Sequence, residues 1–315
     1  MPSEASSHCS AIRSQVGGDG GVHRVFIITE VGEPVAATIG ECPSRCHGSL
    51  PSPMTAVVST MGCTRMHTPS AAMTLVPLVA QRLSTPIGRA YLFEAFPHPL
   101  PGVTTILAAT RPAEDLAGLA DWEARVGPEA AVQIRSAAAE RGTDLHSLIE
   151  AHLGGASVEV PERLMPWWQS VEPFLGRVRK PHLIEGVVYH PTHFYAGTLD
   201  LAADCTLFPG RGEELVLIDW KTARAPKTQR TLGDYPLQLA AYAAALRQSY
   251  GLKVERAAIC LALADQPAQV FLYDRRQLSE HWNAWKRRLV LFWLNCGTHP
   301  LAANALHALR AQTQT

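Results

Sequence analysis

The residues with the clearest chemical potential stand at the end of an apolar run, in the stretch LVLIDWKT at 215–222. On a β-strand, residues two apart project from the same face with Cα atoms about 6.6–6.8 Å apart. Asp219 and Lys221 therefore share a face, and the strand begins in apolar surroundings and ends at a charged site. The alternative is an ion pair at the rim of a sheet, which contributes little to stability.

A second carboxylate makes a functional site the better interpretation. Asp200 ends the stretch GTLD nineteen positions before Asp219, and the turn residues at 209–212 favour pairing of the two strands. Two converging carboxylates need a cation, because burying both in ionised form is costly. Oxygen ligands suit Mg²⁺ or Mn²⁺ better than zinc. Lys221 would then orient the attacking water and offset charge on a phosphate.

A histidine and a glutamate are further candidates. His146 lies within the helix predicted over residues 128–153, where Glu150 follows one turn later and could be its partner. Glu185 interrupts the apolar segment 183–187, so it is either an edge residue of the sheet or part of the site. The residue patterns alone leave both alternatives open.

These candidates fall in a regular succession of expected elements. A helix, three strands, a second helix N-capped by Asp234, two strands and a last amphipathic helix predict an α/β fold with a mixed central β-sheet flanked by helices. The expected ranges are 128–153, then 183–189, 197–207 and 214–222, then 234–251, then 256–264 and 269–273, and finally 278–295.

Residues 1–72 differ from the rest in being rich in Ser, Gly, Pro and Thr without a persistent hydrophobic period. We expect a poorly ordered N-terminal extension, with Met73 as an alternative start and one domain over 73–315. A zinc-compatible spacing also occurs here, but nothing around it predicts a small core, so we do not favour a zinc site. Its residues are Cys42, Cys46, Cys63 and His67.

Composition limits the classes of protein. The 315 residues include 28 Lys+Arg and 28 Asp+Glu, which excludes attachment to nucleic acid through bulk positive charge alone. Neither a long apolar run nor a signal peptide is present, so we expect a soluble, cytoplasmic protein with no membrane partner. Seven irregularly spaced cysteines indicate reduced thiols.

Four motifs in a fixed order resemble the RecB-like branch of the PD-(D/E)xK nucleases, and within it the mitochondrial genome maintenance exonuclease type. The motifs are RGTxxHxxIE at 141–150, AGTLD at 196–200, IDWKT at 218–222 and PLQLAAY at 236–242. The resemblance covers roughly three fifths of the chain and implies a restriction-endonuclease-like core over about 102–295.

The resemblance also implies roles at matching positions. It implies that His146, Asp200 and Asp219 bind the metal, that the Trp220 carbonyl is a further ligand, and that Lys221 is the catalytic lysine.

A second implied group contacts nucleic acid. Gln238 and Tyr242 fall on the family's Gln-x-x-x-Tyr motif, four apart on one helix face, and we add Thr222 from the IDWKT motif. Some relatives hold an iron–sulfur cluster with one cysteine before the core and three after it, but only Cys296 follows the final strands here, so we expect none. The chain also lacks a Gly-x-x-x-x-Gly-Lys-Ser/Thr phosphate loop, so a separate helicase could supply its substrate.

The expected function is that of a Mg²⁺- or Mn²⁺-dependent deoxyribonuclease, an exonuclease acting on single-stranded DNA or DNA ends in repair or replication. Two alternatives are a catalytically silent nucleic-acid-binding adaptor on the same fold and an RNA-directed nuclease. The intact set of Asp200, Asp219 and Lys221 disfavours the silent adaptor.

Basic residues near the last helix allow two interpretations. Arg275, Arg276 and residues 286–288 lie close in sequence to Trp282, Trp285 and Trp293. They form either a solvated face over core aromatics or a groove that follows a nucleic-acid backbone. A third pattern, HPTH at 190–193, contains a proline that forbids the helical geometry of a zinc protease and predicts a turn.

Overall fold

The computed structural model describes residues 26–28, 34–36, 75–208 and 210–311. The chain divides into two units, Met1–Pro69 and Ser70–Thr315. In the first, β1 (Phe26–Ile28) and β2 (Pro34–Ala36) pair as antiparallel strands. The expected extension over residues 1–72 otherwise lies outside the described residues, as do the zinc-compatible residues Cys42, Cys46, Cys63 and His67.

The second unit is built on a five-stranded sheet with the order β10-β9-β8-β7-β6. Of the pairings in this described sheet, β8 with β9 is parallel and the others are antiparallel. A parallel pair requires a crossover connection, which α5 supplies here. The predicted mixed sheet is thus confirmed. Its strands are β6 (Val178–His190), β7 (Tyr195–Cys205), β8 (Glu214–Ala223), β9 (Arg256–Leu263) and β10 (Gln266–Tyr273).

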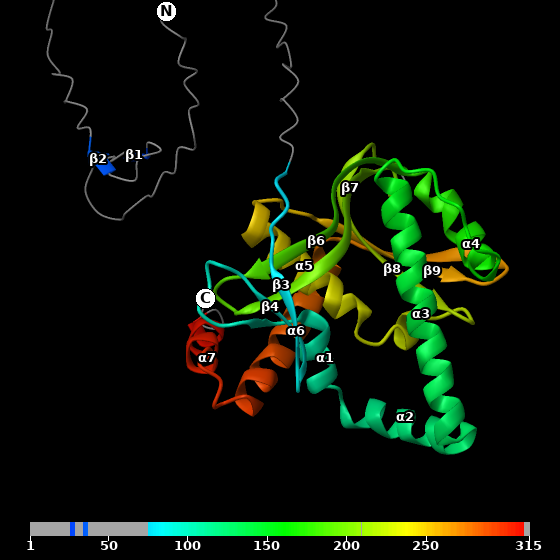
Figure 1. Ribbon diagram of the computed structural model, residues 1–315, viewed down its shortest axis with the longest axis horizontal. Coiled ribbons are helices and arrows are strands. Elements are labelled where there is room, and N and C mark those ends of the chain that lie inside the picture. The colour runs from blue at the N-terminus through cyan, green and yellow to red at the C-terminus, as the bar shows by residue number, and fades with distance from the viewer. Residues whose placement is uncertain (1–25, 29–33, 37–74, 209, 312–315) are drawn as a thin grey trace, which may run out of the picture. The chain divides into compact units, whose positions relative to one another are not determined.

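Helices cover both faces of this sheet (Figure 1). Side chains of α1, α5, α6 and α7 share one hydrophobic core with the sheet, and those of α3 and α4 share another. The helices are α1 (Val103–Ala109), α2 (Ala113–Val126), α3 (Pro128–Leu153), α4 (Met165–Leu175), α5 (Tyr235–Tyr250), α6 (Arg275–Asn295) and α7 (Ala302–Ala311), with 3-10 turns at Glu162–Leu164 and Gln229–Thr231.

Strand β8 shows why its sequence is a continuous apolar run. Leu217 packs into the core on the α5 and α6 side, while Ile218 and Trp220 pack into the core on the α3 and α4 side. A strand buried on both faces has no polar position to alternate with the apolar ones. After Glu214 at the start of β8, the next charged residues of the strand are Asp219 and Lys221, of which Asp219 is buried.

A small three-stranded sheet precedes α1 and has no counterpart among the elements expected from the sequence. It contains β3 (Gln81–Thr85), β4 (Gly88–Leu92) and β5 (Leu100–Pro101), all antiparallel. Gly88 begins β4 with φ +125°, and a Cβ there would lie 2.7 Å from the Thr105 Oγ1 atom, so the β3–β4 hairpin depends on glycine.

Asp234 occupies the predicted N-cap position of α5, and its carbonyl accepts the first helical hydrogen bond from the Gln238 amide at 3.0 Å. Its side chain makes no capping hydrogen bond, because its backbone is already helical at φ −83° and ψ 0°. The carboxylate instead accepts hydrogen bonds from the Arg288 guanidinium at 2.8 and 3.0 Å. Arg288 also donates to the Thr110 hydroxyl and the Leu107 carbonyl, so it joins α6 to α1 and to the start of α5.

The aromatic residues of α6 are divided between core and surface. Trp285 and Trp293 are fully buried, which assigns them to the hydrophobic core, whereas Trp282 is half-buried. The HPTH segment forms a turn between β6 and β7, as predicted. No helix in the described part of the chain combines the length and apolar character needed to cross a bilayer.

Candidate metal site and surrounding cavity

Three neighbouring strands bring acidic residues into one row. The pairing of β6 with β7 places Glu185 opposite Asp200. The pairing of β7 with β8 ends with Leu201 opposite Ile218, and Asp200 and Asp219 lie one position beyond this last pair. Opposed residues of antiparallel strands have Cβ atoms about 4.5–5.5 Å apart. The acidic row, defined as these three carboxylates, therefore converges by strand register.

His146 approaches this row from α3. Its Nδ1 atom lies 3.6 Å from Oε1 of Glu185 and 3.7 Å from Oδ2 of Asp200, and ligand atoms of the three residues lie within 4.8 Å of one another. Its Nε2 atom lies 2.9 Å from the carbonyl oxygen of Trp220, which can only accept a hydrogen bond. Nε2 is therefore the protonated nitrogen, and in the neutral ring Nδ1 offers its lone pair toward the carboxylates.

The same contact bears on the predicted role of the Trp220 carbonyl. In this structure the carbonyl accepts the hydrogen bond of His146 and thereby orients its imidazole, which is a common second role for groups around a metal site. Burial lowers the pKa of His146, but the carboxylates of Asp200 and Glu185 outweigh that effect and leave the pKa above its usual value.

Asp219 and Lys221 share a face of β8 and form an ion pair, as the spacing predicts. Asp219 is only 1% exposed, and the Lys221 ammonium is its partner. Burial lowers the pKa of Lys221, whereas Asp219 and Asp200 raise it beyond that loss. Lys221 is therefore protonated at neutral pH, and its Nζ lies 5.0 Å from the Tyr235 ring centroid.

Asp200 is a buried carboxylate whose pKa lies well above its usual value. Burial, followed by the charge of Asp219, raises its pKa to about 7. Its Oδ2 accepts a hydrogen bond from the Trp220 amide at 2.7 Å. Two buried carboxylates side by side favour a bound cation or a shared proton. Carboxylate oxygens with one imidazole nitrogen fit a divalent cation such as Mg²⁺ or Mn²⁺.

The sequence left Glu185 as either an edge residue of the sheet or part of the acidic cluster, and in the structure it is both. It lies on β6, at the edge of the sheet, and it belongs to the cluster with His146 and Asp200. Its φ of +45° is unusual for a residue with a side chain and costs about 1–3 kcal/mol. Backbone strain of this kind concentrates at functional sites, which supports a role for the glutamate.

A cavity of about 530 Å³ opens over the acidic row between α3, α5 and the β3–β4 hairpin. Gln238 and Tyr242 line it, and the Gln238 amide donates to the Tyr242 hydroxyl at 3.3 Å. Gly197 is required for this packing, because a Cβ there would lie 2.5 Å from the Tyr242 ring. Thr222 is not among the lining residues: it alternates with Lys221 on β8, and its Oγ1 lies near Gly142.

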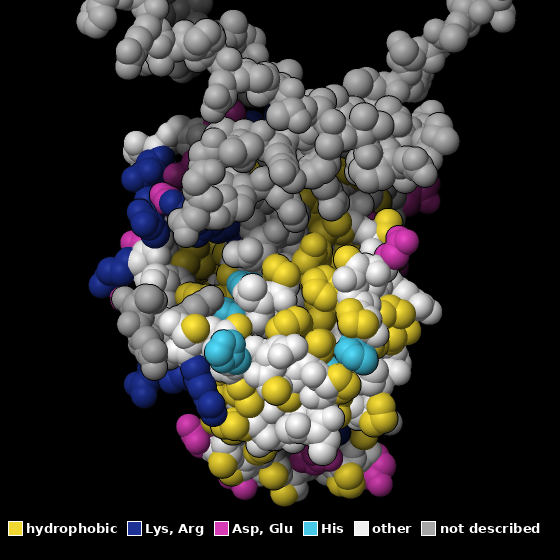
Figure 2. Space-filling model, turned by 90° about the vertical axis from the view of Figure 1, so that its left-hand side faces the viewer, with side chains coloured by type: hydrophobic (Ala, Val, Ile, Leu, Met, Phe, Trp, Pro, Cys, Tyr) yellow, Lys and Arg dark blue, Asp and Glu magenta, His cyan; other side chains and the backbone are white. Residues whose placement is uncertain are grey.

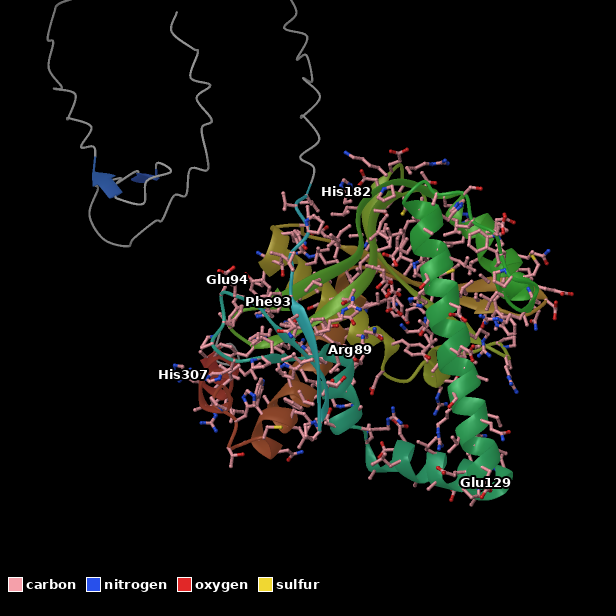
Figure 3. The ribbon with its side chains drawn as sticks, viewed as in Figure 1. Arg89, Phe93, Glu94, Glu129, His182 and His307 are labelled. Atoms are coloured by element: carbon pink, nitrogen blue, oxygen red, sulfur yellow. The ribbon has the colours of Figure 1, made fainter. Side chains whose placement is uncertain are left out.

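Two arginines of the β3–β4 hairpin line the same cavity and were missed by sequence reasoning. Arg82 donates to the Thr198 hydroxyl at 3.1 Å, and the Tyr91 hydroxyl lies 3.2 Å from the same oxygen. Arg89 lies on the hairpin near the centre of the view in Figure 3 and also lines the cavity. No motif or period marks these arginines, because they precede the recognised core and meet it only through tertiary contacts.

A neighbouring cavity of about 510 Å³ continues from the Tyr235 ring toward α2. It is lined by cationic and aromatic side chains together with two carboxylates, Asp115 and Asp234. Asp234 is paired with Arg288, as described above. The cationic and aromatic members are Arg111, Trp122, Lys227, Arg230 and Tyr235.

Sequence comparisons agree with the geometry of the site. The profile of the PD-(D/E)XK nuclease superfamily matches residues 120–303. Proteins named "Mitochondrial genome maintenance exonuclease 1" are 30% identical in Xenopus tropicalis over 201 residues and 30% identical in Homo sapiens over 203 residues. Each alignment covers 60% of this chain, and 56% and 57% of the relatives, so the chain spans little more than half their length.

A solved structure described as a putative exonuclease from Eubacterium rectale aligns with 48% of this chain and 67% of its own, with a TM-score of 0.32 and 13% identity. The family profile is the finding that assigns the chain. It spans more than half of the residues and includes every strand that carries the acidic row. On that ground, the chain belongs to the PD-(D/E)XK nuclease superfamily.

Proposed function

We propose that this chain is a divalent-metal-dependent nuclease that hydrolyses phosphodiester bonds of DNA, acting as an exonuclease on single strands or ends. The observation that carries the proposal is that His146, Glu185, Asp200 and Lys221 line one cavity, with Asp219 buried beside Lys221. Membership of a nuclease superfamily and the exonuclease names of the relatives support it.

The metal would be held by His146, Glu185, Asp200 and Asp219. When bound, a divalent cation supplies Lewis acidity toward phosphate and water. Together with Lys221, these four residues set the charge balance of the site, since three carboxylates face one ammonium and one imidazole. Mg²⁺ and Mn²⁺ both suit this donor set, and Mn²⁺ tolerates the imidazole nitrogen better.

Lys221 is the proposed catalytic residue. As a half-buried ammonium held beside Asp219, it can orient the attacking water and offset the charge that develops on the phosphate. Gln238 and Tyr242 of α5 line the same cavity with an amide and a hydroxyl, which can donate hydrogen bonds to a phosphate oxygen. Thr222 does not line the cavity, so we assign it a supporting role beside Gly142 of α3.

The DNA strand would follow the cationic and aromatic side chains that flank the acidic row. Arg82 and Arg89 would bind phosphates on the hairpin side. Beyond Tyr235, Lys227 and Arg230 would bind further phosphates, with Trp122 available for stacking. A separate helicase as the supplier of single strands stays a prediction from sequence, and so does a cytoplasmic location, since the relatives' name refers to mitochondria.

The test is digestion of end-labelled single-stranded DNA, double-stranded DNA and RNA of the same sequence, with Mg²⁺, with Mn²⁺ and with EDTA. We expect metal-dependent release of short products from DNA, most rapidly from the single strand. Binding without hydrolysis under every metal condition would favour the silent adaptor, and preferential loss of RNA would favour the RNA-directed nuclease. An Asp219→Asn variant controls for a contaminating nuclease.

A further inference from the structure

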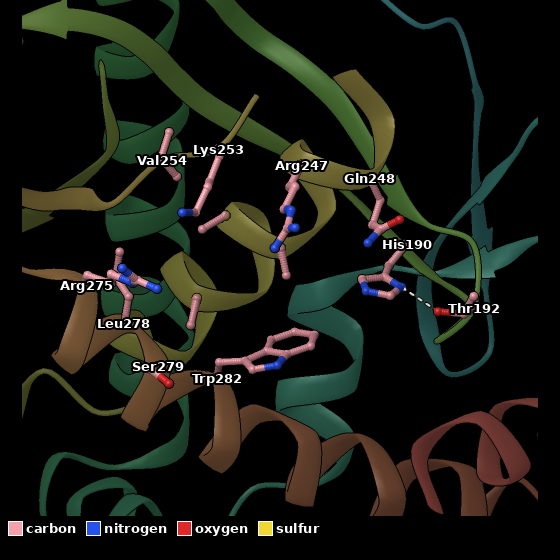
Figure 4. A pocket seen from close by; sticks show the side chains of 13 residues that line it. His190, Thr192, Arg247, Gln248, Lys253, Val254, Arg275, Leu278, Ser279 and Trp282 are labelled. Atoms are coloured by element: carbon pink, nitrogen blue, oxygen red, sulfur yellow. Dashed lines mark hydrogen bonds between the residues drawn. The ribbon is translucent and has the colours of Figure 1, made fainter. Parts of the chain in front are cut away.

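A second large cavity, of about 540 Å³, lies against the other side of α5 (Figure 4). Gln238 of α5 lines the cavity over the acidic row, whereas Ala240, Ala244 and Arg247 line this one. At 100° per residue, Arg247 projects about 180° around the helix axis from Gln238. The helix therefore separates the two cavities, and no residue of the acidic row contributes to the second.

The rim of this cavity is positively charged. Arg247, Lys253 and Arg275 line it, and all three are exposed. Glu255 partly neutralises two of them, with its Oε1 atom 2.7 Å from Lys253 and 3.7 Å from Arg275. Among the described residues, no carboxylate oxygen lies within ion-pair distance of the Arg247 guanidinium. One carboxylate against three cations leaves a surplus that suits an anion.

A stack of rings forms another part of the cavity wall. Trp282 of α6 lies nearly parallel to two buried imidazoles, with ring centroids 5.8 Å from His190 and 5.5 Å from His193. The two imidazoles stack on each other at 4.1 Å, and the Lys286 Nζ atom lies 6.0 Å from the centroid of the same indole. Burial, and then the neighbouring His193, lower the pKa of His190 to about 3, so the stack carries no charge from that residue at neutral pH.

Small side chains keep the space between the cations and the indole open. Ala240, Ala243 and Ala244 form the α5 side of the cavity, where longer side chains would fill it. Gln248, Ser279 and Thr192 add hydrogen-bonding groups around the same space. The cavity thus combines a flat aromatic surface, several polar groups and a cationic rim.

We propose that this cavity binds a nucleotide unit, with its phosphate at Arg247 and its base against Trp282. A guanidinium pairs well with phosphate oxygens, and an aromatic ring suits stacking of a base. An acidic peptide would use the cations but would leave the aromatic surface without a matching partner. The source of the nucleotide is either a DNA strand that extends beyond the acidic row or a free nucleotide.

The test measures binding in EDTA, so that no cleavage occurs, to a fluorescent oligothymidine and separately to dTMP by calorimetry. The variants are Arg247→Ala and Trp282→Leu. The matched control is Arg276→Ala, an exposed arginine on α6, the helix of Trp282, that does not line this cavity and pairs with Glu280. We expect Arg247→Ala and Trp282→Leu each to weaken binding by about fivefold or more, the size typical of a lost stacking contact, while Arg276→Ala stays close to wild type.

The two ligands distinguish the sources. If the two cavity variants bind oligothymidine more weakly but dTMP as well as wild type does, the cavity binds a DNA strand. If they bind dTMP more weakly, the cavity binds a free nucleotide. Unchanged binding of both ligands in both cavity variants would overturn the proposal, as would equal weakening in Arg276→Ala, which would indicate bulk charge. Arg247→Gln and Trp282→Phe, with melting curves, separate misfolding from loss of binding.

Hydrolysis of bis(p-nitrophenyl) phosphate with Mn²⁺ gives a separate measure of the acidic row. We expect Arg247→Ala to leave this rate unchanged, because α5 separates the two cavities. Failure of wild type to hydrolyse any phosphodiester would count against the proposed nuclease function, and nucleotide binding in the second cavity would stand independently of it.

Discussion

At the residue scale, the site is governed by two buried carboxylates on adjacent strands. Asp219 forms an ion pair with Lys221, and Asp200 accepts a hydrogen bond from the Trp220 amide. Neither contact neutralises the pair fully, because burial and Asp219 still raise the pKa of Asp200 to about 7. A dication would relieve this repulsion, and so would removal of one charge.

Asp200→Asn should lower cleavage by more than about a hundredfold, because an amide cannot supply the charge that a hard dication requires. The same change should stabilise the metal-free protein above neutral pH. A carboxyl whose folded pKa is raised contributes stability that is present below its unfolded pKa and is lost as pH rises through about 7. Unfolding curves at pH 5 and pH 8 should therefore differ less in the variant than in wild type.

Lys221→Ala should separate catalysis from binding. Loss of one preorganised charge typically lowers turnover by about a hundredfold or more, while binding to DNA should stay within a few fold of wild type. Lys180→Ala, at an exposed position of β6, is the matched control and should leave turnover unchanged. If the Lys221→Ala enzyme kept the turnover of wild type, Lys221 would not be the catalytic residue.

At the element scale, the β3–β4 hairpin supplies part of the cavity wall although it lies outside the recognised motifs. Its arginines face a cavity that already contains His146 and Lys221. Arg82 is tied to β7 through Thr198, whereas Arg89 has an exposed side chain that can adapt to a ligand. The hairpin therefore extends the acidic site with positive charge suited to phosphates.

Arg89→Ala should weaken binding to single-stranded DNA and reduce the slope of log K against log salt by about 0.7, the amount expected for one lost phosphate contact on a single strand. Titrations at several salt concentrations in EDTA measure both quantities. Arg179→Ala, at an exposed position of β6, is the control. A salt slope equal to that of wild type would show that Arg89 contacts no phosphate.

Another element-scale feature is the connection of α6 to α1 and α5 through Arg288. The guanidinium is 13% exposed and contacts Asp234, Thr110 and the Leu107 carbonyl. Arg288→Ala should lower the free energy of unfolding by about 2 kcal/mol, because it leaves a partly buried carboxylate unpaired. Arg287→Ala, at the adjacent exposed position, should change it by less than about 0.5 kcal/mol. Chemical denaturation checks both values.

At the scale of the whole molecule, a formal net charge of zero hides a strong separation of charge. Figure 2 shows one face of the protein with Lys and Arg gathered along one edge, beside a broad apolar region. Carboxylates converge at the acidic row, while cations line its hairpin side and the second cavity. Local fields of this kind can direct a polyanion to a site without making the whole chain basic.

Residues 1–72 provide the prediction at this scale. All proposed catalytic and metal-binding residues lie at or beyond His146, so a chain that begins at Met73 should retain the specific activity and melting transition of the full chain. Parallel activity assays and calorimetry on the two proteins check this. Loss of activity together with loss of bound zinc would instead assign a structural metal to Cys42, Cys46, Cys63 and His67.

Short-range sequence patterns predicted much of the architecture of the central sheet and its helices. The range 128–153 matches α3 at both ends, because a proline in the first turn and a glycine after the last turn mark helix ends locally. The side-by-side placement of Asp219 and Lys221 follows from the period of a strand, and the mixed sheet follows from the order of elements.

Long-range contacts decided the rest. The Asp234 side chain pairs with Arg288, fifty-four positions away, instead of accepting a capping hydrogen bond from α5, and Arg82 meets Thr198 at a separation of 116. Glu185 joins His146 only because strand register and an unusual backbone angle direct it there. Such contacts leave no periodic trace in the sequence, since periodicity reports which face a residue occupies and not what packs against it. The sequence by itself therefore determined the helices and strands of the central sheet region and the Asp219–Lys221 pair, while the tertiary structure decided which further elements and distant side chains surround them.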